Sequence, residues 1–61
     1  MNPRKVAIRE LESLGFRFLR HGGNHDIYWN PDTRVTIPVK RHDFNENDAC
    51  YILKEARRKR E

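Results

Sequence analysis

The small number of large apolar side chains limits what this chain can fold into more than any other feature. Leucine, isoleucine, valine and phenylalanine together account for 14 of its 61 residues, just above the roughly 20 % below which a charged chain is expected to stay disordered. A chain of this length forms at most one small domain. The sequence therefore predicts one folded unit over residues 1–61 with a thin core.

A first helix is predicted over residues 3–14. Its bounds are marked by an N-cap residue, a proline at the first helical position and a glycine after the end, which are Asn2, Pro3 and Gly15. Apolar residues recur at helical spacing within it, namely Ala7, Leu11 and Leu14.

Three strands are predicted over residues 16–21, 25–30 and 34–39. In the first, Phe16 and Phe18 recur at the two-residue period of a strand. Turn signals separate the strands, at Gly22-Gly23-Asn24 and Asn30-Pro31-Asp32. Because both turns are short, the strands are expected to form an antiparallel meander.

A second helix is predicted over residues 45–58. Asn45 can cap it, and acidic residues follow in its first turn, where they suit the positive end of the helix dipole. Its apolar stripe is Ala49, Ile52, Leu53 and Ala56. Cys50 lies among these positions, and we expect it to be a small buried side chain rather than a nucleophile.

The element order predicts an α+β fold, α-β-β-β-α, with a three-stranded antiparallel sheet and two helices on one face. The apolar residues suffice to cover only that face, so the other face is expected to stay open. In a regular pleat, His25 shares a side with Ile27 and Trp29. Tyr28 and Trp29 can each stack on a base or pack inside, and we expect the one that faces the helices to lie in the core.

The net charge of +4 is unevenly distributed. Residues 54–61, KEARRKRE, hold five basic and two acidic side chains, which fits a solvated helix end or a segment that contacts phosphates. Residues 16–25 contain no acid, and their basic and imidazole side chains are Arg17, Arg20, His21 and His25. Such a stretch favours a polyanionic partner.

Several classes of function are disfavoured. The uncharged apolar runs are too short for a secretory signal or a membrane span, so we expect a soluble, cytosolic protein. No second cysteine is present to form an internal disulfide. The spacing of the histidines and the cysteine fits no compact zinc site, and no glycine-rich loop leads into a helix. Neither a metal nor a cofactor is expected.

The most informative segment is residues 15–31, GFRFLRHGGNHDIYWNP. Together with three later segments, it resembles the HicA family of toxin ribonucleases over residues 4–56. The later segments are Thr36-Ile37-Pro38, Arg41-His42-Asp43-Phe44-Asn45-Glu46 and Ile52-Leu53-Lys54-Glu55-Ala56.

This resemblance implies a fold like that of double-stranded-RNA-binding domains and a ribosome-independent endonuclease activity on messenger RNA. It also implies inhibition by a HicB-like antitoxin in a heteromeric complex. The family's catalytic histidine corresponds to His25. Asn24 stands where many members have serine or threonine, which argues against a role for a hydroxyl group at this position.

The chemistry can also be argued from the residues. RNA carries its own nucleophile, the 2′-hydroxyl, so cleavage without a metal needs a base, an acid and positive groups around the phosphate. Histidine suits the proton transfers because it changes charge between pH 5 and 8. His25 is the candidate catalytic residue, and His42 or His21 could supply a second transfer. The candidate RNA-binding or phosphate-stabilising residues are Arg17, Arg20, Gly23, Asn24, Lys40, Arg41 and His42.

Plainer interpretations remain for the same residues. A strand histidine such as His25 is often only exposed, His42 can be a solvated loop residue, and two glycines are expected in any tight hairpin. Accordingly, a non-catalytic RNA-binding module is an alternative function, and a protein-interaction domain is a third. None of these functions involves a membrane.

Overall fold

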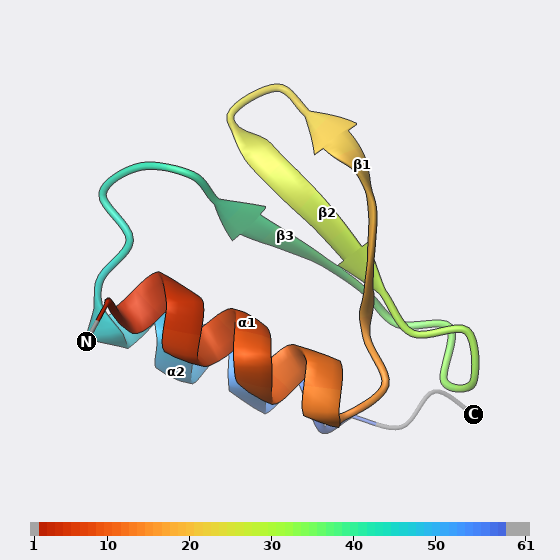
Figure 1. Ribbon diagram of the computed structural model, residues 1–61. Helices are drawn as coiled ribbons and strands as arrows, with labels where there is room; N and C mark the ends of the chain where they lie inside the picture. Colours follow the sequence, from red (N-terminus) through yellow and green to blue (C-terminus); the bar gives the residue numbers. More distant parts are fainter. Residues whose placement is uncertain (1, 59–61) are drawn as a thin grey trace.

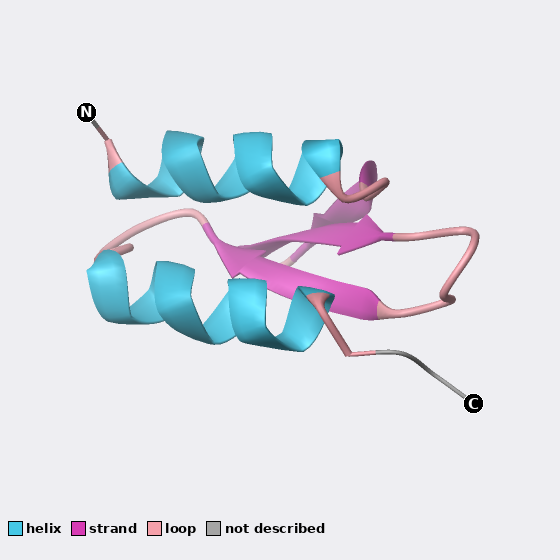
Figure 2. Ribbon diagram, turned by 90° about the horizontal axis from the view of Figure 1, so that it is seen from below, coloured by secondary structure: helices cyan, strands magenta, loops and turns pink. Residues whose placement is uncertain are grey.

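The computed structural model describes residues 2–58 and confirms the predicted order of elements. The helices α1 (Pro3–Ser13) and α2 (Glu46–Ala56) flank the strands β1 (Arg17–Gly22), β2 (His25–Trp29) and β3 (Thr36–Lys40) in the sequence. The strands form one antiparallel sheet in the order β1-β2-β3. Both helices lie side by side on one face of the sheet (Figures 1 and 2), so no helix of residues 2–58 covers the opposite face.

Side-chain caps fix where both helices begin. Oδ1 of Asn2 accepts hydrogen bonds from the backbone N–H groups of Arg4 and Lys5, at 2.8 and 3.4 Å. At the start of α2, Oδ1 of Asn45 accepts from the N–H of Asp48 at 3.1 Å, and Oδ2 of Asp48 accepts from the N–H of Asn45 at 3.0 Å. This reciprocal pair is a capping box. The predicted N-caps are confirmed.

The core is one layer of side chains between the helices and the sheet. Alternate residues of β2 and β3 point into it, whereas their neighbours along each strand point to the open side. The buried residues of the core are Ala7, Leu11, Phe16, Tyr28, Ile37, Val39, Ile52 and Ala56.

Two residues depart from the predicted apolar pattern. Leu14 is 39 % exposed because α1 ends at Ser13, which leaves Leu14 as the C-cap outside the helical stripe. Phe18 is 47 % exposed because it lies in an edge strand. A β-bulge between Phe18 and Arg20 also interrupts the two-residue period in the second half of β1.

The prediction of a buried Cys50 is wrong, since this residue is exposed. The side of α2 that faces the core carries Ile52 and Ala56, with Ala49 and Leu53 packed against them. Successive helical residues are rotated by about 100°. Cys50 therefore lies outside the stripe that its neighbour Ala49 helps to form.

The second helix ends two residues before its predicted end, at Ala56. Beyond it, Arg57 and Arg58 are exposed, and Nη1 of Arg58 lies 3.1 Å from Oε2 of Glu55. These residues behave as a solvated helix end, and phosphate contact by the basic run 54–61 stays a prediction. Residues 59–61 of that run lie outside the described residues. In the described part of the chain, no helix is long and apolar enough to cross a membrane.

Asn30 is a polar residue buried to 3 % exposure, and it joins two loops. Its Nδ2 donates to the carbonyl of Leu14 at 2.9 Å, and its Oδ1 accepts from the N–H groups of Asp32 and Thr33 at 2.8 and 3.3 Å. Gly15 passes close beside it at φ +97°, where a β-carbon would lie 3.2 Å from Nδ2. Both the backbone conformation and the space therefore require glycine at this position.

We predict that Asn30→Ala lowers the free energy of unfolding by about 1–3 kcal/mol, because it leaves a carbonyl and two N–H groups without their partner. Urea unfolding followed by circular dichroism measures the change. The matched control is Asn47→Ala, in an exposed side chain of α2, which should shift stability by less than about 0.5 kcal/mol. Equal stability of the two variants would contradict the role given to Asn30.

Candidate active site

The sheet face that the helices leave uncovered, here called the open face, carries basic residues and no acidic residue at its strand positions. Residues that pair directly across antiparallel strands share a face. His25 pairs with Gly22 on one side and with Lys40 on the other. The open face consists of Arg17, Arg20 and Gly22 from β1, His25, Ile27 and Trp29 from β2, and Thr36, Pro38 and Lys40 from β3. Its charge suits a polyanion.

A hollow of about 360 Å³ lies at the end of the open face that carries the β1–β2 turn. His25 is half-buried in this region, and His42 is exposed. The lining residues are Asn24, His25, Lys40, His42 and Asp43. The fold thus brings together four of the predicted site residues, with Asp43 in addition.

Backbone contacts hold the loop after β3 against the β1–β2 turn. The N–H of Arg41 donates to the carbonyl of Asn24 at 3.2 Å, one residue beyond the pairing of His25 with Lys40. Asp43 then has a φ of 56°, in the left-handed region that aspartate tolerates better than most residues. The chain therefore bends directly after His42, beside the hollow.

The glycines of the turn have different roles. Gly23 has a φ of +60°, as a tight hairpin with glycine at its first central position requires, and a β-carbon there would meet nothing within 4 Å. At Gly22, a β-carbon would lie 3.3 Å from Nη1 of Arg20 and 3.3 Å from Cγ1 of Ile27. Because Gly22 has no side chain, the Arg20 guanidinium can lie next to it. Gly22 pairs with His25 across the β1–β2 strands.

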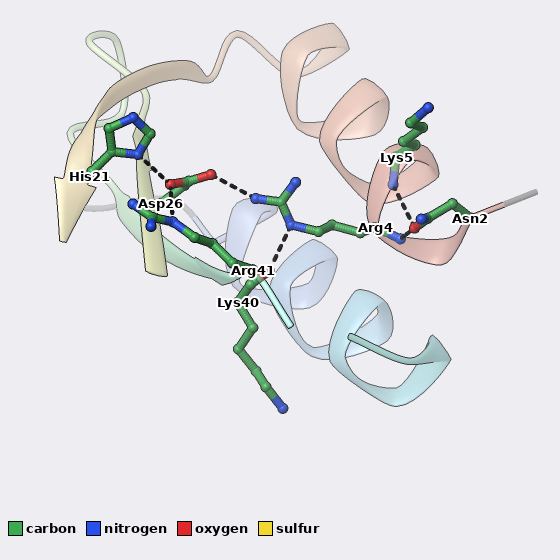
Figure 3. Close-up of polar contacts among 7 residues, drawn as sticks. All are labelled: Asn2, Arg4, Lys5, His21, Asp26, Lys40 and Arg41. Atoms are coloured by element: carbon green, nitrogen blue, oxygen red, sulfur yellow. Dashed lines mark hydrogen bonds and ion pairs between the residues drawn. The ribbon is translucent and has the colours of Figure 1, made fainter. Parts of the chain in front are cut away.

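Three side chains, those of Arg4, Arg41 and His21, converge on Asp26, on the helix-facing side of β2 (Figure 3). Its Oδ2 lies 2.7 Å from Nη2 of Arg4 in α1, and its Oδ1 lies 2.9 Å from Nε of Arg41. Nδ1 of His21 in β1 lies 2.7 Å from the same Oδ1. The Asp26 carboxylate thus connects α1, β1, β2 and the loop after β3.

These contacts keep Asp26 ionised. The hydrogen bond from His21 has the largest effect on its pKa, burial opposes it, and the hydrogen bonds from Arg41 and Arg4 lower the pKa further, to about 2. An ionised carboxylate only accepts hydrogen bonds, so Nδ1 of His21 carries the proton that it shares with Asp26.

Nε of Arg4 also donates to the carbonyl of Lys40 at 2.7 Å. The Lys40 side chain itself points away from Asp26 (Figure 3), and its Nζ lies 3.4 Å from Oδ2 of Asp48. The Asn45 N–H and the Lys40 ammonium lower the pKa of Asp48. The ammonium of Lys40 is therefore paired with the first turn of α2, and Lys40 also lines the hollow.

Three other candidate residues, Arg17, Arg41 and His21, do not line the hollow. Arg17 pairs with Trp29 at the opposite end of β2. Arg41 is held by Asp26, with 35 % of its side chain exposed. His21 pairs with Asp26 instead of lining the hollow.

The two candidate stacking residues of β2 lie on opposite faces of the sheet, as the alternation along a strand requires. Tyr28 is buried in the core, where its ring meets that of Phe18 edge-on at 5.8 Å between centroids. Trp29 is half-buried on the open face. Of the two, Trp29 is thus the one available to a nucleic-acid base.

Sequence reasoning missed three residues that shape this region, Arg4, Asp26 and Asp43. Asp26 directly follows the candidate histidine and is the first acid after the acid-free stretch 16–25, which is a signal that could have been followed. Asp43 follows His42 in the same segment. Arg4 carries no signal, because 22 residues separate it from Asp26.

Residues 2–58 contain no group of three or more histidine, cysteine, aspartate or glutamate side chains that could hold a metal ion. Near His25, the groups suited to charge stabilisation are the side chains of Arg20 and Lys40. The arrangement offers two imidazoles, two cations and exposed backbone at one end of a sheet.

Comparison with known proteins gives a family but no individual relative. Residues 4–58 match the family model described as HicA toxin of bacterial toxin-antitoxin. No curated protein and no solved structure matches the chain. The matched segment contains every residue that lines the hollow and the complete Asp26 cluster.

We predict that Asp26→Asn lowers the free energy of unfolding at pH 7 by about 2 kcal/mol, with the effect confined to the pH range in which Asp26 is ionised. The pKa of Asp26 is about 2 in the folded protein and about 3.9 in an unfolded chain. Its contribution is therefore fully present above about pH 4 and is lost as the pH falls towards about 2.

Urea unfolding of the wild type and the variant between pH 2 and 7 measures this difference. The control is Asp32→Asn, which makes the same change of charge at an exposed carboxylate. A stability difference between wild type and Asp26→Asn that stays constant down to pH 2 would show that the ion pairs are not its source.

Proposed function

Because the chain belongs to the HicA toxin family of bacterial toxin-antitoxin systems, we propose that it is a toxin that cleaves messenger RNA without a metal ion. His25 is its catalytic residue, and a HicB-like antitoxin neutralises it. The observation that carries the proposal is the position of His25 beside His42 and Lys40 in a hollow on the acid-free face of the sheet.

The proposed reaction uses the 2′-hydroxyl of the RNA as the nucleophile. Catalysis then requires a proton acceptor near that hydroxyl, a proton donor near the departing 5′ oxygen, and positive charge around the phosphate. His25 is half-buried, and its side chain has no hydrogen-bond or ion-pair partner within residues 2–58, so the ring is available for a proton transfer. Imidazole does this near neutral pH.

Phosphate binding is assigned to the groups that surround His25. The Arg20 guanidinium and the Lys40 ammonium supply positive charge, and Gly23 and Asn24 present the turn backbone and an amide side chain. Arg17 can contact the RNA farther along the open face, and Arg41 can do so through the exposed part of its side chain. The α-β-β-β-α order is compatible with a fold like that of double-stranded-RNA-binding domains.

The antitoxin is proposed to cover the open face. The centre of that face is apolar, because Ile27 pairs with Pro38 and Trp29 lies beside them. A partner that buries these side chains blocks the approach of RNA and also stabilises the thin fold by binding only its folded form. This part of the proposal requires a HicB-like reading frame beside the gene. If no such reading frame is found there, the proposed inhibition by an antitoxin is contradicted.

We predict that His25→Ala lowers the rate of RNA cleavage about 100-fold or more, the typical contribution of one proton-transfer group. The measurement is single-turnover cleavage of messenger RNA in the presence of EDTA, with growth inhibition in cells as a second readout. RNA affinity should change little. A wild-type protein that binds RNA but leaves it intact would favour the non-catalytic RNA-binding module instead.

A second prediction concerns Arg20, whose guanidinium lies over Gly22. Loss of one phosphate contact in Arg20→Ala should weaken binding to all RNA sequences alike and reduce the slope of log affinity against log salt by about one. Binding titrations at several salt concentrations measure this slope. Arg9→Ala, which removes an exposed arginine from α1, is the control. An unchanged slope in Arg20→Ala would exclude Arg20 from the interface.

A further inference from the structure

Two of the three histidines lie at the same hollow, and the third does not. His25 and His42 both line it, from β2 and from the loop after β3 respectively. His21 lies on the helix-facing side, where its Nδ1 is bound to Asp26 at 2.7 Å. The fold therefore distinguishes between His42 and His21, the two histidines that the sequence offers for a second proton transfer.

We propose that His42 is the second proton-transfer group of the reaction and acts with His25 on the same phosphate. This inference rests on the proposed ribonuclease function and goes beyond it, because it divides the chemistry between two rings. It requires that His42 be accessible, that its ring be unengaged, and that its backbone be held near His25.

His42 is accessible and its ring is unengaged, so the first two requirements are met. The residue is exposed at the hollow, and its ring has no hydrogen-bond or ion-pair partner in the described chain. Both ring nitrogens can therefore exchange protons with a bound substrate. His21, by contrast, has one nitrogen committed to Asp26.

Contacts on either side of His42 meet the third requirement. The preceding residue, Arg41, is fixed by its backbone bond to Asn24 at 3.2 Å and by its side-chain bond to Asp26 at 2.9 Å. Arg4 holds the carbonyl of Lys40 at 2.7 Å. His42 is thus carried on a backbone that is anchored to the turn next to His25, which limits the space its ring can sample.

The charged groups around the two rings come from four elements. Arg20 reaches the region from β1, Lys40 from β3 and Asp43 from the loop itself, while Asp48 of α2 pairs with Lys40. A phosphate in the hollow can meet the cations Arg20 and Lys40. The carboxylate of Asp43 repels a phosphate, which disfavours it as a phosphate ligand.

The proposed step balances as an internal transesterification. One imidazole, neutral at the start, takes the proton of the 2′-hydroxyl while O2′ forms a bond to phosphorus. The bond from phosphorus to O5′ breaks, its electron pair goes to O5′, and the other, protonated imidazole gives its proton to that oxygen. The products are a 2′,3′-cyclic phosphate and a 5′-hydroxyl, and water restores the two rings to their starting protonation states.

The test compares wild type, His25→Ala, His42→Ala and His21→Ala in single-turnover cleavage with EDTA between pH 5 and 9. We expect a bell-shaped profile for the wild type, because one ring must be neutral and the other protonated. His42→Ala should lower the rate about 100-fold or more and remove one limb of the profile, with RNA affinity changed less than about threefold. His21→Ala should keep both limbs.

A second substrate separates the two proton transfers. It carries sulfur in place of the 5′ oxygen at the bond that the wild type cuts, and a thiolate leaves without needing a proton. The rate of one histidine variant, the one that lacks the acid, should recover on this substrate, and that of the other should not. Recovery of both variants or of neither would contradict a division of the two transfers between these rings.

The other possible results also test the proposal for His42. If His42→Ala keeps both limbs of the profile, or if its defect lies in RNA affinity alone, the proposal for His42 is wrong although His25 can still be catalytic. If His21→Ala loses a limb instead, His21 is the second group. If the wild type itself leaves RNA intact in EDTA, the proposed function is wrong, and the proposal for His42 is wrong with it. Thermal unfolding shows that each variant is folded, and Asp43→Asn controls for charge changes in the same loop.

Discussion

The Asp26 carboxylate holds together the end of the sheet on which the site depends. Arg4, His21 and Arg41 approach it from α1, β1 and the loop after β3, and without a common anion the guanidinium groups of Arg4 and Arg41 would repel one another. Burying a carboxylate is costly, and here three hydrogen-bond donors offset that cost. The same contacts fix the loop that carries His42, so the stability of this region and the geometry of the hollow share one cause.

The alternation of β2 separates the structural role of this segment from its chemical role. Asp26 and Tyr28 point to the helices, where they contribute the ion cluster and the core, whereas His25 and Trp29 point to the open face. The contacts that Asp26 makes on the helix-facing side therefore also position His25, the preceding residue, on the open face. Part of the positive charge is bound by Asp26, and Arg17, Arg20 and Lys40 remain on the side where RNA is proposed to bind.

How far the sequence predicts this structure depends on the range of each interaction. The caps at Asn2 and Asn45 and the helical stripes act within a few residues, and apart from Leu14 they were predicted correctly. Cys50 was placed wrongly because proximity in the sequence was taken for a shared helix face. The bulge after Phe18 has no signal in the side-chain pattern. The placement of His42 and His25 at one hollow depends on the register of β2 against β3, which local sequence does not determine.

The shortage of apolar residues explains why polar contacts hold so much of this fold. A domain of this size has only a few kcal/mol of net stability. Its one-layer core is supplemented by the side-chain hydrogen bonds of Asn30 and Asp26. Ile27 and Trp29 are left half-buried on a face that no helix of residues 2–58 covers. In the proposed function, RNA and the antitoxin compete for that face. A protein that inhibits the toxin there also completes its hydrophobic burial, so inhibition and stabilisation follow from the same contact.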